Sequence, residues 1–526
     1  MKEVASVDNL TNRLHTPELK QQLSTIWERF FQMIKIPYPK TRELPHGDAS
    51  QMVNFSKEYA NSNRFGFEVD NCQNVCIGVA ATEGHETDRE IVVQGHHDAV
   101  FVGEPDPSVF GVNPIVTEDG EWVKGDGTNL TADNRLGCAV ALTAVEALAQ
   151  SGKAHGPIKI LLTAGEDSGL IGATYLGVSK SNFLNGNQTV INVDSSDGPE
   201  WITIGCASGS RDNITIPVNR ESIGSKKLVK FTFSGFSGGH SGLDIGKDRP
   251  SSIKFFAEMF SRLKLQFPNI GLVSIKAGEA FNAIPASGSF ILAVNGQDEE
   301  KVRTAIADYI DQIKKQIPPD APDDYRKSRI NINALPQKLS QDEEQIDLQL
   351  DTATTDLLIN VLSELPQGVG QKDNDTILYS NNVGKIEIDQ DTLTIQTMTR
   401  GKETSYRDIL REQIRKVAEK YHVSLEEKLA YRHWLDHPER NIVKQALRIG
   451  RELLARETKT RVSGGGLEPG IFEGEFPGLE AISIAVAQIK DEHSLDERVN
   501  IASLEEGYRL LYTLLTEAPK AYSSFS

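Results

Sequence analysis

The sequence predicts an α/β protein in which a mainly parallel sheet is sandwiched by helices and interrupted by an inserted α+β domain. Short continuous apolar runs alternate with helix-like segments over residues 1–206, and the same texture returns over 433–526. Between them, at 207–432, strand-like segments alternate apolar and polar residues. Continuous apolar strands between helices are typical of parallel sheets buried on both faces, whereas alternation is typical of half-exposed antiparallel strands.

The first part of the chain supplies most of the predicted parallel sheet. Apolar residues at helical spacing predict a helix over 19–36, which Pro37 and Pro39 end, and a second helix is expected near 51–63. Small and apolar residues predict two further helices, at 133–152 and 169–180. Buried strands are expected at 65–69, 74–80, 89–95, 158–164 and 189–193. Because ligands of such sheets bind at the carboxyl ends of the strands, the polar residues there are the first candidates for function.

The inserted domain is expected to contain two similar halves. The first half contains predicted strands at 228–236 and 271–294 and helices at 251–265 and 300–317, and a similar strand and helix texture recurs over 347–423. The stretch between the halves, 318–329, is rich in proline and charge and is expected to be an exposed linker. After it, a strand at 482–489 and a helix at 503–515 complete the first domain.

Composition excludes several classes of protein. A length of 526 residues predicts two or more domains. The net charge of −18 argues against a nucleic-acid partner, because such binding depends on Lys and Arg neutralising phosphates. The sequence contains no apolar run of about eighteen residues, so no membrane span is expected. No secretion signal is recognisable either, and a cytoplasmic location is therefore expected. The four cysteines are expected to be free thiols.

Acidic residues and histidines follow the predicted strands. His96 and Asp98 end one strand and point to the same side, where they could bind zinc or belong to a solvated loop. Asp133 stands at the start of a predicted helix, where it could be a metal ligand or an ordinary helix N-cap. Glu166 and Asp167 end another strand, and two adjacent buried carboxylates are costly unless a cation lies nearby.

Asp194 ends a third strand, and His493 follows the apolar run at 482–489. Taken together, these residues place two imidazoles and several carboxylates at one edge of one sheet. The nitrogen and oxygen donors suit zinc, with manganese or cobalt as alternatives. A bridging carboxylate with further His and acid ligands is typical of two-metal hydrolytic sites.

Eight segments in order along the chain resemble the zinc aminopeptidase/carboxypeptidase/aminoacylase family, and most closely its aminoacyl-histidine (X-His) dipeptidase branch. They are GHHDAV (95–100), GEWVKGDGTNLTADNRLG (120–137), LLTAGEDSGLIGA (161–173), INVDSSDGPEWITIGCASG (191–209), SGGHSGLDIGKDRPSS (237–252), FNAIPASGSF (281–290), GGGLEPGIF (464–472) and HSLDERVNIASLEE (493–506). The resemblance implies a cytosolic metallopeptidase that hydrolyses short peptides with two divalent ions, zinc above all.

The resemblance also implies a role for each metal-site residue. Asp133 would bridge the ions, with His96 and Asp194 completing one site and Asp167 and His493 the other. Glu166 would be the general base, and Asp98 would orient the imidazole of His96.

The inserted domain would be a lid and dimerisation domain, so that the protein forms a homodimer. His240 would stabilise the oxyanion, and the substrate carboxylate would bind Asn282, Arg249 and Arg400, although each Arg could equally be a surface charge. Glu468 would bind the substrate's amino group.

Two positions depart from the family pattern. Asp167 stands where close relatives carry a second glutamate, and Gly464 stands where the X-His branch places a histidine, which leaves the preferred side chain of the substrate open. Two other functions remain as alternatives: an amidohydrolase of N-acyl amino acids, and a non-catalytic metal- or peptide-binding protein on the same scaffold. A non-catalytic binding protein should have lost Glu166 or a metal ligand, and none of these residues is missing from this chain.

Overall fold

The chain forms two compact units in the structure, a computed structural model that describes residues 3–11, 17–39, 47–242, 244–374, 376–389 and 391–523. Unit 1 comprises Met1–Cys206, Trp434–Val462 and Leu467–Ser526. Unit 2 comprises Ala207–His433 and Ser463–Gly466. In the order of the sequence, unit 2 is therefore inserted into unit 1.

Unit 1 is built on an eight-stranded sheet with the strand order β2-β3-β7-β4-β8-β22-β9-β21. The four central strands run parallel, and they are β7 (Ile158–Thr163), β4 (Glu90–His96), β8 (Gln188–Ser195) and β22 (Glu480–Ala485). The outer strands are β2 (Gly66–Val69), β3 (Val75–Val79), β9 (Trp201–Cys206) and β21 (Lys459–Ser463). Since β3 is antiparallel to β7 and β9 to β22, the sheet is mixed and mainly parallel at its centre, which confirms the predicted fold class.

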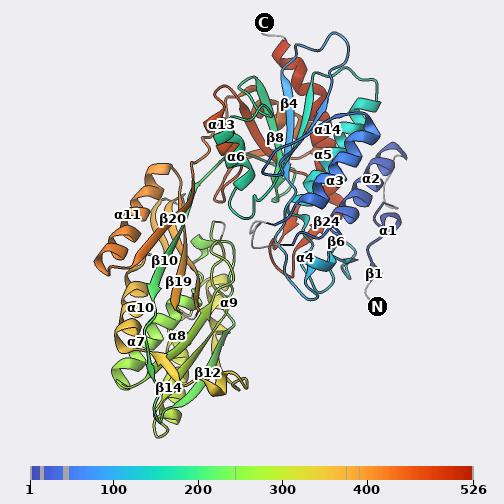
Figure 1. The fold of residues 1–526 in the computed structure, drawn as a ribbon. Helices are drawn as coiled ribbons and strands as arrows, with labels where there is room; N and C mark the ends of the chain where they lie inside the picture. The colour runs from blue at the N-terminus through green and yellow to red at the C-terminus, as the bar shows by residue number, and fades with distance from the viewer. Residues whose placement is uncertain are drawn as a thin grey trace. The chain divides into compact units, whose positions relative to one another are not determined.

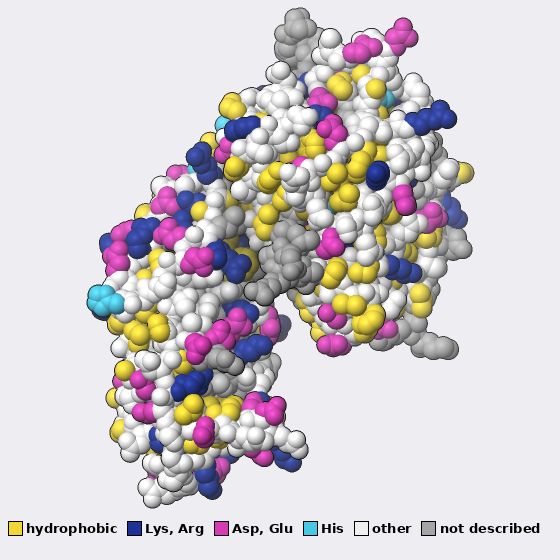
Figure 2. All heavy atoms as spheres, in the orientation of Figure 1, with side chains coloured by type: hydrophobic (Ala, Val, Ile, Leu, Met, Phe, Trp, Pro, Cys, Tyr) yellow, Lys and Arg dark blue, Asp and Glu magenta, His cyan; other side chains and the backbone are white. Residues whose placement is uncertain are grey.

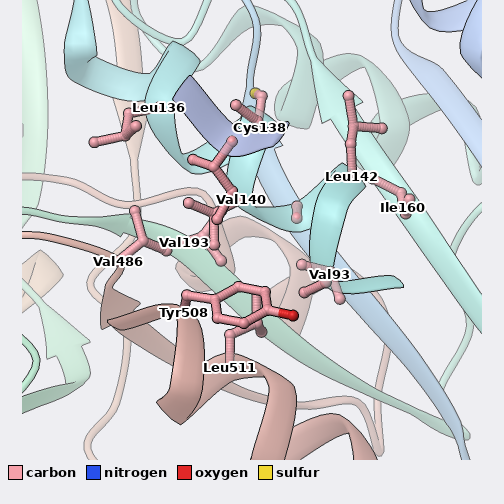
Figure 3. Close-up of a cluster of buried hydrophobic side chains, with 14 of the residues drawn as sticks. Val93, Leu136, Cys138, Val140, Leu142, Ile160, Val193, Val486, Tyr508 and Leu511 are labelled. Atoms are coloured by element: carbon pink, nitrogen blue, oxygen red, sulfur yellow. The ribbon is translucent and has the colours of Figure 1, made fainter. Parts of the chain in front are cut away.

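Helices cover both faces of this sheet (Figure 1). One face packs against α2 (Pro17–Met33), α5 (Ala132–Gln150), α12 (Asn441–Leu454) and α14 (Ile501–Ser523), and the other against α6 (Ile171–Ser179) and α13 (Pro469–Glu475). Successive strand residues serve opposite faces, as the strand period of two requires. Val93 thus lies in the core under α5 and α14, which Figure 3 shows, while Val92 lies in the core under α6 and α13.

A smaller five-stranded antiparallel sheet completes unit 1, with the strand order β1-β5-β6-β24-β23. Its strands are β1 (Glu3–Val4), β5 (Pro114–Val116), β6 (Trp122–Gly125), β23 (Ile489–Lys490) and β24 (Arg498–Asn500). Helices α1 (Val7–Thr11), α3 (Ser50–Asn63) and α4 (Pro107–Phe110) also belong to this unit. The pairing of β24 with β6 brings the segment between β23 and β24, which contains His493, next to a segment nearly four hundred residues earlier.

Unit 2 contains a nine-stranded antiparallel sheet with the strand order β15-β12-β14-β13-β18-β19-β10-β20, with β17 paired to β18. Its strands are β10 (Ser208–Pro217), β12 (Lys227–Ser234), β13 (Gly271–Ala277), β14 (Gly288–Val294), β15 (Asn333–Gln337), β17 (Gly368–Asp373), β18 (Thr376–Ile388), β19 (Thr392–Gly401) and β20 (Ser424–Tyr431). A separate ribbon pairs β11 (Arg220–Ser222) with β16 (Leu348–Leu350). The helices are α7 (Ser252–Gln266), α8 (Glu299–Lys315), α9 (Asp323–Ile330), α10 (Thr352–Glu364) and α11 (Thr404–Lys420).

Residues 318–329, expected to be an exposed linker, are mostly exposed or half-buried, but more than half of the stretch lies in helix α9. Pro322 precedes the helix with an extended backbone, and Asp323 opens it, where a carboxylate suits the positive helix end. Lys327 and Arg329 lie in the last turn, where cations are favoured. Proline and charge therefore begin and end a helix here instead of preventing one.

The surface and the thiols agree with an ordinary globular protein. On the face shown in Figure 2, Lys and Arg side chains are interspersed with Asp and Glu. The four cysteines are free, as expected, and Cys76, Cys138 and Cys206 are buried. In the part of the chain that the structure describes, no helix combines the length and apolar character needed to cross a bilayer.

Candidate metal centre

The candidate centre lies in unit 1, at the carboxyl ends of the central parallel strands. His96 is the last residue of β4, and Asp194 is the last but one of β8. Glu166 and Asp167 follow β7, which lies beside β4. Because these strands run parallel, their ends meet at one edge of the sheet, and the side chains that the sequence placed there come together.

Asp133 lies between two imidazoles that come from distant parts of the chain. Its Oδ1 is 3.1 Å from Nε2 of His96, and its Oδ2 is 3.1 Å from Nε2 of His493. One carboxylate thus presents one oxygen to each imidazole. The peptide bond between Asp133 and Asn134 is cis.

Each imidazole faces a second carboxylate of its own. Nε2 of His96 is 3.3 Å from Oδ1 of Asp194, and Nε2 of His493 is 3.0 Å from Oδ1 of Asp167. In each of these two groups, one donor atom per residue lies within 4.8 Å of the others. The two groups share Asp133 and form two adjacent sets with nitrogen and oxygen donors, and His96 also groups with Glu166 and Asp167.

Asp98 and Glu166 lie beside these sets. Oδ1 of Asp98 is 3.4 Å from Nδ1 of His96, on the far side of the ring from Asp133. The Asp98 carboxylate also accepts hydrogen bonds from the backbone amides of Glu166 at 3.0 Å and Asp167 at 3.2 Å. Oε2 of Glu166 is 4.0 Å from Nε2 of His96, farther than either carboxylate oxygen of the set around that imidazole.

Several carboxyl groups of the cluster have shifted pKa values. Burial raises the pKa of Glu166 well above its usual value, and it raises the pKa of Asp194 to about 7, against the opposing effect of His96. For Asp133, burial acts in the same direction, but hydrogen bonds from His493 and His96 hold its pKa well below the usual value. Carboxyls with raised pKa values indicate a place where positive charge, as protons or as metal ions, is strongly favoured.

The donor set fits divalent cations. Five carboxylates converge here with only two imidazoles, and within the described residues none of the five forms an ion pair with a lysine or arginine. Oδ2 of Asp167 is buried without a hydrogen-bond partner. Buried, uncompensated carboxylates are costly, and nitrogen and oxygen donors without a thiolate suit zinc.

Asp133 does not act as a helix N-cap, the alternative that its position in the sequence left open. Its backbone is not helical, with ψ of 109°, and its carboxylate faces the imidazoles. The amides of Thr131, Ala132 and Asp133, at the start of α5, donate to Glu497. The sequence singled out no role for Glu497, although it lies four residues after His493 in a quoted segment.

Glu468, predicted to bind the substrate's amino group, is fully buried in unit 1. Its Oε2 accepts a hydrogen bond from Thr163 at 2.7 Å and another from Gln94. Oε1 is buried without a partner, so it can still accept a hydrogen bond. Burial raises the pKa of Glu468 to about 8.

The other predicted residues gather within unit 2. Nε2 of His240 is 3.3 Å from a guanidinium nitrogen of Arg400, which is buried in β19. Asp244 accepts a hydrogen bond from the His240 amide at 2.9 Å and pairs with Arg249 at 3.2 Å. The carbonyl of Asn282 accepts the amide of the residue after His240 at 2.9 Å. Unit 2 therefore brings His240, Arg249, Asn282 and Arg400 together.

Two further residues of unit 2 border this group. The hydroxyl of Tyr431, which the sequence did not single out, lies 3.0 Å from Arg400. Gly464 packs on the backbone of Gly242, and a Cβ at 464 would lie 2.4 Å from the Gly242 carbonyl oxygen. The absence of a side chain at 464 is therefore required by the local packing.

Comparisons with known proteins agree with this geometry. Residues 78–239, which include six of the seven metal-site residues named above, match Peptidase family M28. The cytosol non-specific dipeptidase of Escherichia coli is 28% identical over 504 residues, which is 94% of this chain and 97% of the relative. The crystal structure of aminoacylhistidine dipeptidase from Vibrio alginolyticus has a TM-score of 0.63 at 24% identity, covering 97% of this chain and 98% of that chain. The di-peptidase Dug1p of Saccharomyces cerevisiae has a TM-score of 0.55 at 13% identity and covers 98% of this chain and 99% of that one.

Proposed function

We propose that the chain is a member of the M20/M28-type zinc peptidase family and a dipeptidase that uses two divalent metal ions, zinc above all. The observation that carries the proposal is Asp133, whose two oxygens face two imidazoles at 3.1 Å each. His96, Asp133 and Asp194 would hold one ion, and His493, Asp133 and Asp167 the other. Asp167 replaces the glutamate of close relatives, yet its Oδ1 lies 3.0 Å from Nε2 of His493.

Glu166 is the residue that we assign as general base. When bound, the two ions would polarise the scissile carbonyl and lower the pKa of a water from about 15.7 toward neutrality. Glu166 accepts the proton of the attacking water and returns it to the leaving amine. Burial raises the pKa of Glu166, which favours the step in which its carboxylate accepts a proton. Asp98 fixes the base through the Glu166 amide.

The substrate is bound through its two charged ends in this proposal. Arg400, with Arg249 and Asn282, binds the carboxylate, since a guanidinium pairs with a carboxylate through two parallel hydrogen bonds. His240 stabilises the oxyanion, and its 3.3 Å approach to Arg400 places both on one part of unit 2. Oε1 of Glu468, which is buried and without a partner, accepts from the amino group.

The proposed enzyme is cytoplasmic and forms a homodimer. Four free thiols and the similarity to a cytosol dipeptidase support a cytoplasmic enzyme. A homodimer formed through the inserted unit remains a prediction from the family resemblance.

A panel of dipeptides, X-His included, tests the function. The metal-stripped protein is assayed with and without zinc, manganese or cobalt, and N-acyl amino acids form a second panel. We expect cleavage of dipeptides that depends on added metal. If only N-acyl amino acids are cleaved, the protein is an amidohydrolase. If neither panel is cleaved under any metal, the proposal fails and a binding protein is favoured.

A further inference from the structure

A buried glutamate outside the ligand set holds the segment that carries Asp133. The side chain of Glu497 is buried, and the residue is 1% exposed. Its carboxylate accepts hydrogen bonds from five consecutive residues. The donors are Asn129 Nδ2 at 2.9 Å and the amides of Leu130 at 3.2 Å, Thr131 at 3.0 Å, Ala132 at 2.8 Å and Asp133 at 3.3 Å. The carboxylate thus fixes the backbone up to the Asp133 amide.

These hydrogen bonds hold the backbone that carries the Asp133 side chain. With its amide bound to Glu497, Asp133 directs both carboxylate oxygens at the imidazoles. Thr131, in the same segment, has φ of 58°, a strained left-handed backbone that persists only where surrounding contacts hold it.

Glu497 also connects this segment to the second imidazole. It lies four residues after His493, and its amide donates to the carbonyl of Ser494 at 3.1 Å. The next residue, Arg498, begins β24, which pairs with β6. One side chain therefore joins the two segments that supply Asp133 and His493.

We propose that Glu497 is a positioning residue for the metal centre: it holds the Asp133 carboxylate between the two imidazoles and so sets the affinity for both ions. The inference rests on the proposed function, since it assumes metal ions at Asp133. Removing a residue that orients a metal ligand typically lowers metal affinity about 10–100-fold. A purely structural role would lower thermal stability without changing metal affinity.

The test compares Glu497→Gln with a matched control, Glu473→Gln. Glu473 is a largely buried carboxylate of the same unit that accepts the Ala481 amide at 2.9 Å and pairs with Arg440, and it makes no contact with the metal ligands among the described residues. Zinc affinity is measured on the metal-free full-length proteins by competition with a chromophoric chelator. The visible spectrum of the cobalt-loaded proteins reports the ligand geometry, and the melting temperature reports stability.

We expect Glu497→Gln to bind zinc about 10–100-fold more weakly than the wild type, with an altered cobalt spectrum. Glu473→Gln should have a lower melting temperature but keep the wild-type zinc affinity and cobalt spectrum. Wild-type affinity and spectrum in Glu497→Gln would overturn the inference and leave the proposed function intact. If the wild type itself binds no metal, the proposed function falls and the inference with it.

A shorter carboxylate supplies the test if Glu497→Gln does not fold. Glu497→Asp keeps the charge but withdraws it by one methylene from the amides. Weaker zinc binding than in Glu473→Gln supports the positioning role, and wild-type binding contradicts it.

Discussion

Replacing Glu166 by glutamine separates catalysis from metal binding. Glutamine keeps the size of the side chain, and the Glu166 amide still donates to Asp98. The side-chain oxygen nearest His96 is 4.0 Å from Nε2, whereas the assigned ligands Asp133 and Asp194 lie at 3.1 and 3.3 Å. The variant should therefore lose a base and keep the ligands.

The size of the effect follows from the assigned role. A positioned general base contributes about 10²–10⁴ in rate. At about 1.36 kcal/mol for each factor of ten, the activation free energy should rise by about 2.7–5.4 kcal/mol. Since no assigned ligand is removed, zinc affinity should stay within about tenfold of the wild type, below the usual loss for a perturbed metal shell.

The assay measures kcat and KM for the best dipeptide, together with the zinc affinity of the metal-free protein. Glu121→Gln, an exposed glutamate of the same unit, is the control for the substitution itself. A large fall in kcat at unchanged zinc affinity supports the assignment. A parallel loss of zinc would show that Glu166 is a ligand, and nearly full activity would show that another group is the base.

Two further variants test the surroundings of the site. Asp98→Asn should lower zinc affinity and kcat/KM about 10–100-fold, because an amide cannot orient His96 and accept two backbone amides as the carboxylate does. Unchanged values of both would show that Asp98 does not orient His96. Gly464→His should destabilise the protein by about 1–3 kcal/mol, because its Cβ would overlap the Gly242 carbonyl oxygen, and should not favour X-His dipeptides. The melting temperature and the kcat/KM ratio of X-His to other dipeptides check this, and a raised ratio would contradict it.

The sequence was sufficient to predict the part of the site that depends on regular structure. His96, Glu166 and Asp194 follow continuous apolar runs, and parallel strands bring such positions to one edge wherever the rest of the chain lies. The approach of His493 to Asp133 depends instead on the pairing of β24 with β6, a long-range contact that no local pattern encodes. For His493, the family resemblance was the guide.

Other features escaped prediction because their partners are backbone groups. Glu497 accepts hydrogen bonds from four backbone amides, and every non-proline residue has such an amide, so the sequence does not indicate which ones it binds. Asp133 has the sequence position of a helix cap, yet its carboxylate faces two imidazoles, one of them from the far end of the chain. Helix α9 was missed for a related reason, since Pro322 can interrupt a chain or precede a helix, and composition does not distinguish the two.

The central claim is that two ions shared by Asp133 carry out dipeptide hydrolysis. Its most direct test is a titration of the metal-free protein with zinc, in which bound zinc and cleavage of the best dipeptide are measured in the same samples. Hydrolysis by two shared ions predicts that about two zinc ions bind per chain and that cleavage reaches its maximum only as the second ion binds. Full activity with one ion, or two bound ions without cleavage, would contradict it.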